Sequence, residues 1–97
     1  MAFTTDEIIS VATGEVKTPD PDIIDNVGGS RATKARVTNR FGVLLYRFDS
    51  DPDAATDEGH LLQPSETTDI LGYDNIKNLR FAIEGSTTSK VFISYGN

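Results

Sequence analysis

Residues 79–95 read LRFAIEGSTTSKVFISY, and their alternation of apolar and polar side chains predicts the fold class of the chain. Large apolar side chains occupy every second position of two segments, and these positions are Leu79, Phe81, Ile83, Val91, Ile93 and Tyr95. A period of two is typical of strands with one buried and one solvent-exposed face. The intervening residues 85–89 contain Gly85 and hydroxyl side chains, which favour a tight reversal. The two segments are therefore predicted to be strands that pair as a hairpin.

Shorter apolar segments upstream extend this pattern. They predict strands at residues 33–39, 41–48, 61–64 and 67–71, with a polar loop at residues 49–60 and a turn at residues 72–75. Residues 41–48 are the most continuously apolar and predict a central strand. Short strands separated by turn signals are typical of small sandwiches and barrels. We therefore expect an all-β domain over residues 33–97, either a small antiparallel β-sandwich or a Greek-key barrel.

The first 32 residues differ in composition from the rest of the chain. They contain six acidic and two basic residues, and Pro and Gly interrupt them at residues 19–22 and 28–30. Because such a segment buries little apolar surface by itself, we expect residues 1–32 to be an N-terminal arm that forms an interface with a partner. Thr4 and Glu7 have capping-box spacing and predict a short helix, whereas the β-branched residues that follow favour an extended segment. Both conformations remain open.

Length and composition exclude several classes of function. Ninety-seven residues suit one domain, and fifteen Asp and Glu against nine Lys and Arg give a net charge of -6. This charge repels phosphate backbones and anionic lipids, so neither nucleic acid nor a membrane is expected as a partner. The absence of Cys excludes disulfides, thiolate zinc sites and Cys nucleophiles. With no secretory leader pattern and no apolar run longer than residues 41–46, we expect a soluble protein made in the cytoplasm.

The acidic loop at residues 49–60 resembles a helix–loop–helix calcium loop in part. Acidic residues occupy its first, third, fifth and ninth positions, namely Asp49, Asp51, Asp53 and Asp57. The sixth position requires Gly and holds Ala54, and the twelfth requires a bidentate Glu and holds His60. The pattern therefore favours a solvated loop over a metal site, and a calcium-stabilised adhesion-type domain is the third-ranked hypothesis for the chain.

His60 is the chain's single histidine and the main candidate for a catalytic base. It has no Cys partner, and the neighbouring Asp57 and Glu58 favour its protonated form, which is the wrong form for a base. A domain of this size also offers little room for a large cleft between paired carboxylates. We expect His60 to be a surface residue, and we expect no enzymatic activity, no catalytic residue, no cofactor and no bound metal.

Two features suggest binding. The basic residues Lys34, Arg36, Arg40 and Arg47 follow one another with no acidic residue between them. They form either a solvated strand face or a patch that meets an acidic surface. Tyr73, in its predicted turn, is the aromatic side chain most expected to be exposed, and Phe92 lies opposite the buried side of its strand, either on a second buried face or at an interface.

Residues 69–85, DILGYDNIKNLRFAIEG, followed by KVFISY at residues 90–95, resemble small structural proteins of tailed-bacteriophage virions. Residues 37–39, 45–48 and 61–64 fit the same pattern, so the resemblance covers about residues 35–97 and leaves the expected arm outside it. Its motifs are short and structural, without a catalytic signature.

The resemblance implies a non-enzymatic capsid decoration (cement) protein located in the virion. The implied partner is the major capsid protein or another virion protein, and a homo-oligomer is implied, with a trimer favoured. The residues expected at interfaces are Ile8, Ile9, Ile23, Ile24, Val27, Arg36, Arg40, Tyr73 and Phe92. The alternative is a tail- or fibre-associated module that binds carbohydrate or a host surface through Tyr73 and residues 49–60.

Overall fold

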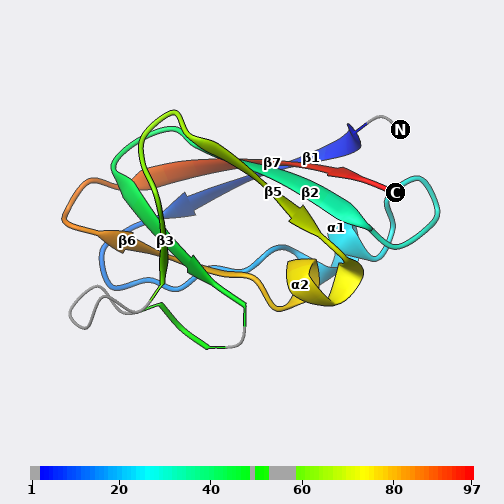
Figure 1. The fold of residues 1–97 in the computed structure, drawn as a ribbon, viewed down its shortest axis with the longest axis horizontal. Coiled ribbons are helices and arrows are strands. Elements are labelled where there is room, and N and C mark those ends of the chain that lie inside the picture. Colours follow the sequence, from blue (N-terminus) through cyan, green and yellow to red (C-terminus); the bar gives the residue numbers. More distant parts are fainter. Residues whose placement is uncertain (1–2, 49, 53–58) are drawn as a thin grey trace.

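Two antiparallel sheets pack face to face in the computed structural model, which describes residues 3–48, 50–52 and 59–97 (Figure 1). Its elements are β1 (Phe3–Val11), α1 (Pro21–Ile24), β2 (Lys34–Asn39), β3 (Val43–Arg47), β4 (His60–Leu62), β5 (Thr67–Leu71), α2 (Tyr73–Lys77), β6 (Arg80–Glu84) and β7 (Ser89–Gly96). The expectation of a small antiparallel all-β sandwich is confirmed. Among the described residues, no helix is long and apolar enough to cross a membrane.

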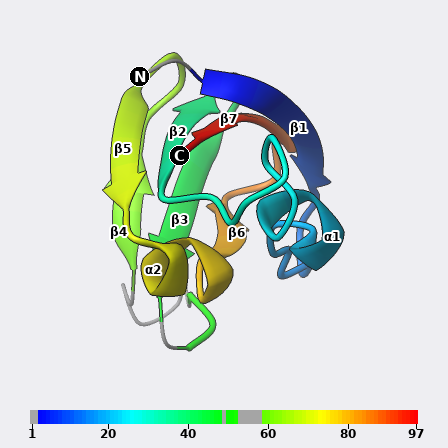
Figure 2. The same ribbon diagram turned by 90° about the vertical axis from the view of Figure 1, so that its right-hand side faces the viewer.

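The larger sheet has the strand order β1-β7-β2-β5, and the smaller has the order β4-β3-β6. The larger sheet curls around the smaller one, so that β3, β6 and both helices lie on its inner side (Figure 2). β3 pairs with β4 on one side and β6 on the other, which confirms the central strand expected over residues 41–48. The opposite side of the larger sheet is its outer face.

The core fills the space between the sheets, and it uses the faces that the alternation predicted. Val37 and Ile93 of the larger sheet, and Leu44 and Phe81 of the smaller one, are all buried. Each sheet therefore has one apolar side turned toward the other sheet, which is the arrangement that removes most apolar surface from water.

The predicted hairpin between residues 79–84 and 90–95 is wrong. β6 pairs with β3 in the smaller sheet, and β7 lies between β1 and β2 in the larger sheet. The loop at residues 85–88 therefore carries the chain from one sheet to the other. The strands are adjacent in sequence and both have a buried side, but they contribute to the core from opposite layers, as in other sandwiches.

Residues 3–32 do not form the separate arm that we expected. β1 pairs with β7 along its length, from Phe3 opposite Gly96 to Val11 opposite Ser89. Five apolar side chains of this segment belong to the core, namely Ile9, Val11, Ile24, Val27 and Ala32. The extended conformation is therefore correct and the capping-box helix is wrong. The physical reason is that alternate residues of β1 face the core, so that its β-branched side chains gain more from sheet packing than from a helix.

The predicted turn at residues 72–75 is instead the start of α2. Gly72 has a positive φ of 93°, which turns the chain out of β5 and into this short helix. Ile76 on α2 is buried and packs into the core, and Tyr73 packs against the core from its edge. α2 therefore covers one end of the space between the sheets.

Tyr95 is the largest fully buried side chain, and its hydroxyl links β7 to β1. The hydroxyl donates a hydrogen bond of 2.7 Å to Glu7 Oε1. The same carboxylate accepts from the backbone N–H of Asp20, at 3.1 Å for Oε2. Burial raises the pKa of Tyr95, so its hydroxyl remains a donor at physiological pH. The Glu7 carboxylate therefore joins β7 and the segment around Asp20 to β1.

We expect Tyr95→Phe to lower the free energy of unfolding by about 1 kcal/mol, because it removes the hydrogen bond to Glu7 Oε1 while keeping the buried ring. Urea unfolding followed by circular dichroism would measure the change. Tyr46→Phe is the matched control, since the Tyr46 hydroxyl has no hydrogen-bond partner among the residues that the structure describes. Equal stability of the Tyr95→Phe variant and the wild-type chain would contradict the role given to this hydrogen bond.

Candidate interaction surface

The outer face of the larger sheet collects most of the binding features found in the sequence. The residues that define this face are Phe3, Asp6, Ile8 and Ser10 from β1, Lys90, Phe92 and Ser94 from β7, Lys34, Arg36, Thr38 and the adjoining Arg40 from β2, and Thr67, Asp69 and Leu71 from β5. Their positions follow from the pleat, because the alternate residues of the same strands are buried in the core.

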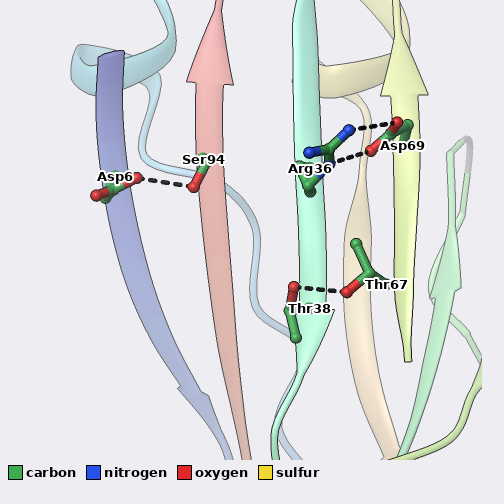
Figure 3. A network of polar contacts seen from close by, with 6 residues as sticks. All are labelled: Asp6, Arg36, Thr38, Thr67, Asp69 and Ser94. Carbon is green, nitrogen blue, oxygen red and sulfur yellow. Dashed lines mark hydrogen bonds and ion pairs between the residues drawn. The ribbon is translucent and has the colours of Figure 1, made fainter. Parts of the chain in front are cut away.

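One row of polar side chains crosses all four strands of the outer face. The register places Asp6, Ser94, Arg36 and Asp69 side by side (Figure 3). Ser94 Oγ donates to Asp6 Oδ1 at 2.8 Å, and Arg36 Nε and Nη2 donate to the two Asp69 oxygens at 2.9 and 3.1 Å. Hydrogen bonds from Arg36 hold the pKa of Asp69 below its usual value. Asp69 is therefore negatively charged at neutral pH and lies beside the Arg36 guanidinium.

The next row combines apolar and hydroxyl side chains. Ile8 and Phe92 are direct cross-strand neighbours, and Thr38 and Thr67 continue the row across β2 and β5. The two threonine hydroxyls share a hydrogen bond of 2.9 Å (Figure 3). Ile8 is 59% exposed, although it lies near the centre of its strand. The outer face therefore has an apolar region on the β1 side of this row.

Aromatic rings hold three of the basic side chains against the sheet. Lys34 Nζ lies 4.5 Å and Arg36 Cζ 4.8 Å from the centroid of the Phe3 ring. Arg40 Cζ lies 5.0 Å from the centroid of the Phe92 ring. Such cation–π contacts restrict long side chains that would otherwise move freely in solvent. They also place positive charge directly over apolar surface.

The charge of the outer face differs in sign from that of the whole chain. Among the described residues, the face carries the basic side chains Lys34, Arg36, Arg40 and Lys90 but only the acidic side chains Asp6 and Asp69. The complete chain has a net charge of -6. The face is therefore a locally positive region on a negatively charged protein, and Arg40 has no carboxylate partner among the described residues.

Four of the nine residues expected at interfaces lie on this face, namely Ile8, Arg36, Arg40 and Phe92. Phe92 is half-buried, and the Arg40 guanidinium lies over its ring. Phe92 therefore does not lie on a second buried face. Ile9, Ile24 and Val27 are core residues, and Ile23 packs against the core. The prediction that these four form an interface is wrong, because the segment that contains them is part of the sandwich.

Tyr73 is not the exposed aromatic side chain that we expected. It is half-buried, and its hydroxyl donates a hydrogen bond to Asp25 Oδ1. This hydrogen bond raises the pKa of Tyr73. Arg31 Cζ lies 4.6 Å from the centroid of its ring. Tyr73 therefore links α2 to the residues around α1, and its ring is occupied by contacts within the chain.

His60 is exposed, as predicted, and it stacks on aromatic side chains that sequence reasoning did not group together. Its ring centroid is 5.1 Å from that of Tyr46 and 6.3 Å from that of Phe48. Tyr46 and His60 are cross-strand partners in β3 and β4, so the register of the smaller sheet brings these rings together. No signal in the sequence alone gives that register.

The calcium hypothesis concerns residues that are mostly outside the described part of the chain, including Asp49, Asp53 and Asp57. Asp51 is described, and its Oδ1 lies 3.4 Å from Arg80 Nη1. Within residues 3–48, 50–52 and 59–97, no cluster of three or more acidic or histidine side chains could hold a metal ion.

Comparison of the chain with protein-family models, with curated proteins and with solved structures finds no match in any of the three.

Proposed function

We propose that this chain is a non-enzymatic structural protein of a tailed-phage virion, most specifically a capsid decoration protein. In this proposal the outer face of the larger sheet binds the major capsid protein or another virion protein. The observation that carries the proposal is the composition of that face, in which the basic side chains of β7 and β2 lie between an exposed Ile8 on β1 and an exposed Leu71 on β5. The resemblance of residues 35–97 to small virion proteins supports the choice of partner.

The outer face suits binding because it is ordered before a partner arrives. Its strands are held by backbone pairing, and three of its long basic side chains, Lys34, Arg36 and Arg40, are held by ion-pair or cation–π contacts. Binding would therefore cost less side-chain entropy than binding through free Lys and Arg side chains. Arg and aromatic residues are also the types that contribute most at interfaces between proteins.

Charge complementarity defines the kind of surface that the face would meet. The positive face attracts an acidic patch, while the remaining negative charge of the chain repels it from other orientations. The chain would therefore bind an acidic capsid surface with the outer face of its larger sheet turned toward that surface. This replaces the expected arm as the means of attachment, because residues 3–32 belong to the sandwich.

We expect Arg40→Glu to weaken binding to phage heads by about tenfold or more, since it reverses the charge of a basic side chain of the proposed contact that has no carboxylate partner among the described residues. The assay is co-sedimentation of the purified chain with heads of the phage that encodes it, prepared without the chain. Lys77→Glu on α2 is the matched control, because it changes the net charge equally away from the face. Equal binding by the Arg40→Glu variant and the wild-type chain would refute the proposed face.

The alternative function, a tail- or fibre-associated module that binds carbohydrate or a host surface, is favoured by one observation. Tyr46, Phe48 and His60 form a group of rings beside the described ends of the 49–60 loop. Aromatic rings of this kind offer apolar faces to sugars. Binding of the wild-type chain on a glycan array, without binding to heads, would favour this alternative.

A further inference from the structure

The four edge strands of the sandwich are not equally protected. The outer edge of β6 is covered by Lys17, whose backbone exchanges hydrogen bonds of 2.9 and 2.8 Å with Phe81. β4 has three residues and β5 has five, whereas β1 has nine. Proteins protect long edges with charged side chains, Lys above all, or with Pro, bulges or shortness. β1 contains neither Lys nor Pro, its irregular pairing is confined to its start, between Phe3 and Thr5, and its charged side chains are Asp6 and Glu7.

The centre of β1 is apolar on the outer face. Ile8 is 59% exposed there, with Asp6 two residues before it and Ser10 two residues after it. An exposed aliphatic side chain at the middle of a long edge strand that has neither Lys nor Pro favours pairing with another strand.

We propose that β1 pairs with β1 of a second copy of this chain, antiparallel, about a two-fold axis at Ile8. The two larger sheets would then join into one continuous sheet, with both outer faces on the same side. Two-fold symmetry makes such an interface self-complementary, since each strand offers the other the same residues. The proposal does not depend on the proposed function, because it concerns self-association alone.

The charges of β1 select this register. An axis at Ile8 places the two Ile8 side chains together and sets Asp6 of each copy opposite Ser10 of the other, an acceptor opposite a donor. An axis at Asp6 or at Glu7 would place two carboxylates directly opposite each other, which is destabilising. An axis at Ile9 lies closer to the end of β1, so fewer residues of the two strands would pair. It would also place Ile8 of each copy opposite Ser10 of the other, and not opposite a second isoleucine. The register at Ile8 is therefore the one that covers the exposed apolar side chain without opposing like charges.

The inner side of β1 is compatible with the same register. It places Glu7 opposite Ile9 of the second copy, and the Glu7 carboxylate is already satisfied by Tyr95 and by the N–H of Asp20. No unpaired charge is brought into the contact by this arrangement. The self-complementary contact would add backbone hydrogen bonds along the edge to the contact between the two isoleucines.

The other edge of the larger sheet does not offer an equivalent contact. Leu71 on β5 is 69% exposed, but a two-fold axis at the centre of β5 would set Asp69 opposite Asp69 of the second copy. An axis at Ile70 would avoid this and leave three paired residues. Pairing of β1 with β5 of a neighbouring copy would instead give a ring or a filament, which the test below distinguishes.

We expect the wild-type chain to sediment as a dimer and Ile8→Lys to raise its dissociation constant by at least tenfold, because edge lysines oppose strand pairing. Analytical ultracentrifugation over about 1–100 µM, a range suited to interfaces of moderate affinity, would measure both. Leu71→Lys is the matched control, because it places the same charge at an even more exposed leucine on the opposite edge. A wild-type chain that stays monomeric, or a trimer dissociated equally by Leu71→Lys, would overturn the proposal.

A cross-link tests the register and does not require Ile8→Lys to fold. The chain has no Cys, so Ile8→Cys introduces a single thiol, which should form a disulfide-linked dimer on mild oxidation. Leu71→Cys introduces an equally lone thiol on β5 and should not cross-link under the same conditions. Cross-linking by both variants, or by neither, would overturn the two-fold axis at Ile8.

Discussion

A chain that begins at residue 33 is expected not to fold. Removal of residues 1–32 deletes β1, exposes the edge of β7, and takes Ile9, Val11, Ile24 and Val27 out of the core. Each of these side chains contributes about 1.5–3 kcal/mol when buried. Their sum is comparable with the whole stability of a small domain, about 5–15 kcal/mol. Circular dichroism and the dispersion of amide proton resonances would measure the loss of structure.

The missing segment should restore the fold when it is added as a separate peptide. Residues 1–32 can pair with β7 and supply the same core side chains in trans, since the contact is made across the sheet and not through the covalent link at residue 33. The control peptide carries Val11→Asp, which would bury an unpaired carboxylate at a fully buried position. A stable, dispersed spectrum for residues 33–97 alone would show that the N-terminal segment is an arm after all.

The expected arm shows why composition misleads at an edge strand. Residues 1–32 are polar overall because β1 has one solvent-exposed side and because the residues after it form connections. Their partner lies at the other end of the chain, where Tyr95 contacts Glu7. A window of sequence that contains only the first 32 residues cannot reveal that partner, whereas the alternating burial within β1 becomes evident once β7 is placed beside it.

Strands could be predicted more reliably than their pairing. The buried sides of β2, β6 and β7 follow from period-two alternation, which is a local property of the sequence. The pairing of β6 with β3, and not with β7, depends on which layer each strand joins, and the turn at residues 85–88 does not encode that choice. The composition of the outer face also depends on strand pairing, which the sequence alone does not give. Arg36, Arg40 and Phe92 were candidates from the sequence, but their alignment with Ile8 requires the register of β1, β7 and β2.

Replacing Asn39 with leucine is expected to lower the free energy of unfolding by about 3 kcal/mol, because it removes three hydrogen bonds at a fully buried position, two of them buried and one part-buried. Asn39 is fully buried at the end of β2. Its Nδ2 donates to the carbonyl oxygens of Gly42 at 2.9 Å and Leu62 at 2.8 Å, and its Oδ1 accepts from the Ser89 hydroxyl. Because Leu62 belongs to the smaller sheet, this side chain joins the two layers of the sandwich.

Urea unfolding of Asn39→Leu and of a control, Asn75→Leu, separates this network from the general effect of the substitution. Asn75 is exposed on α2 and donates one hydrogen bond, to the carbonyl of Leu71, so its replacement should cost well under half as much. Ser89→Ala tests the network itself. Its effect should be smaller in the Asn39→Leu background than in the wild-type chain, since the two side chains share one hydrogen bond. Additive effects, or an Asn39→Leu variant as stable as Asn75→Leu, would show that apolar packing alone holds the two sheets together.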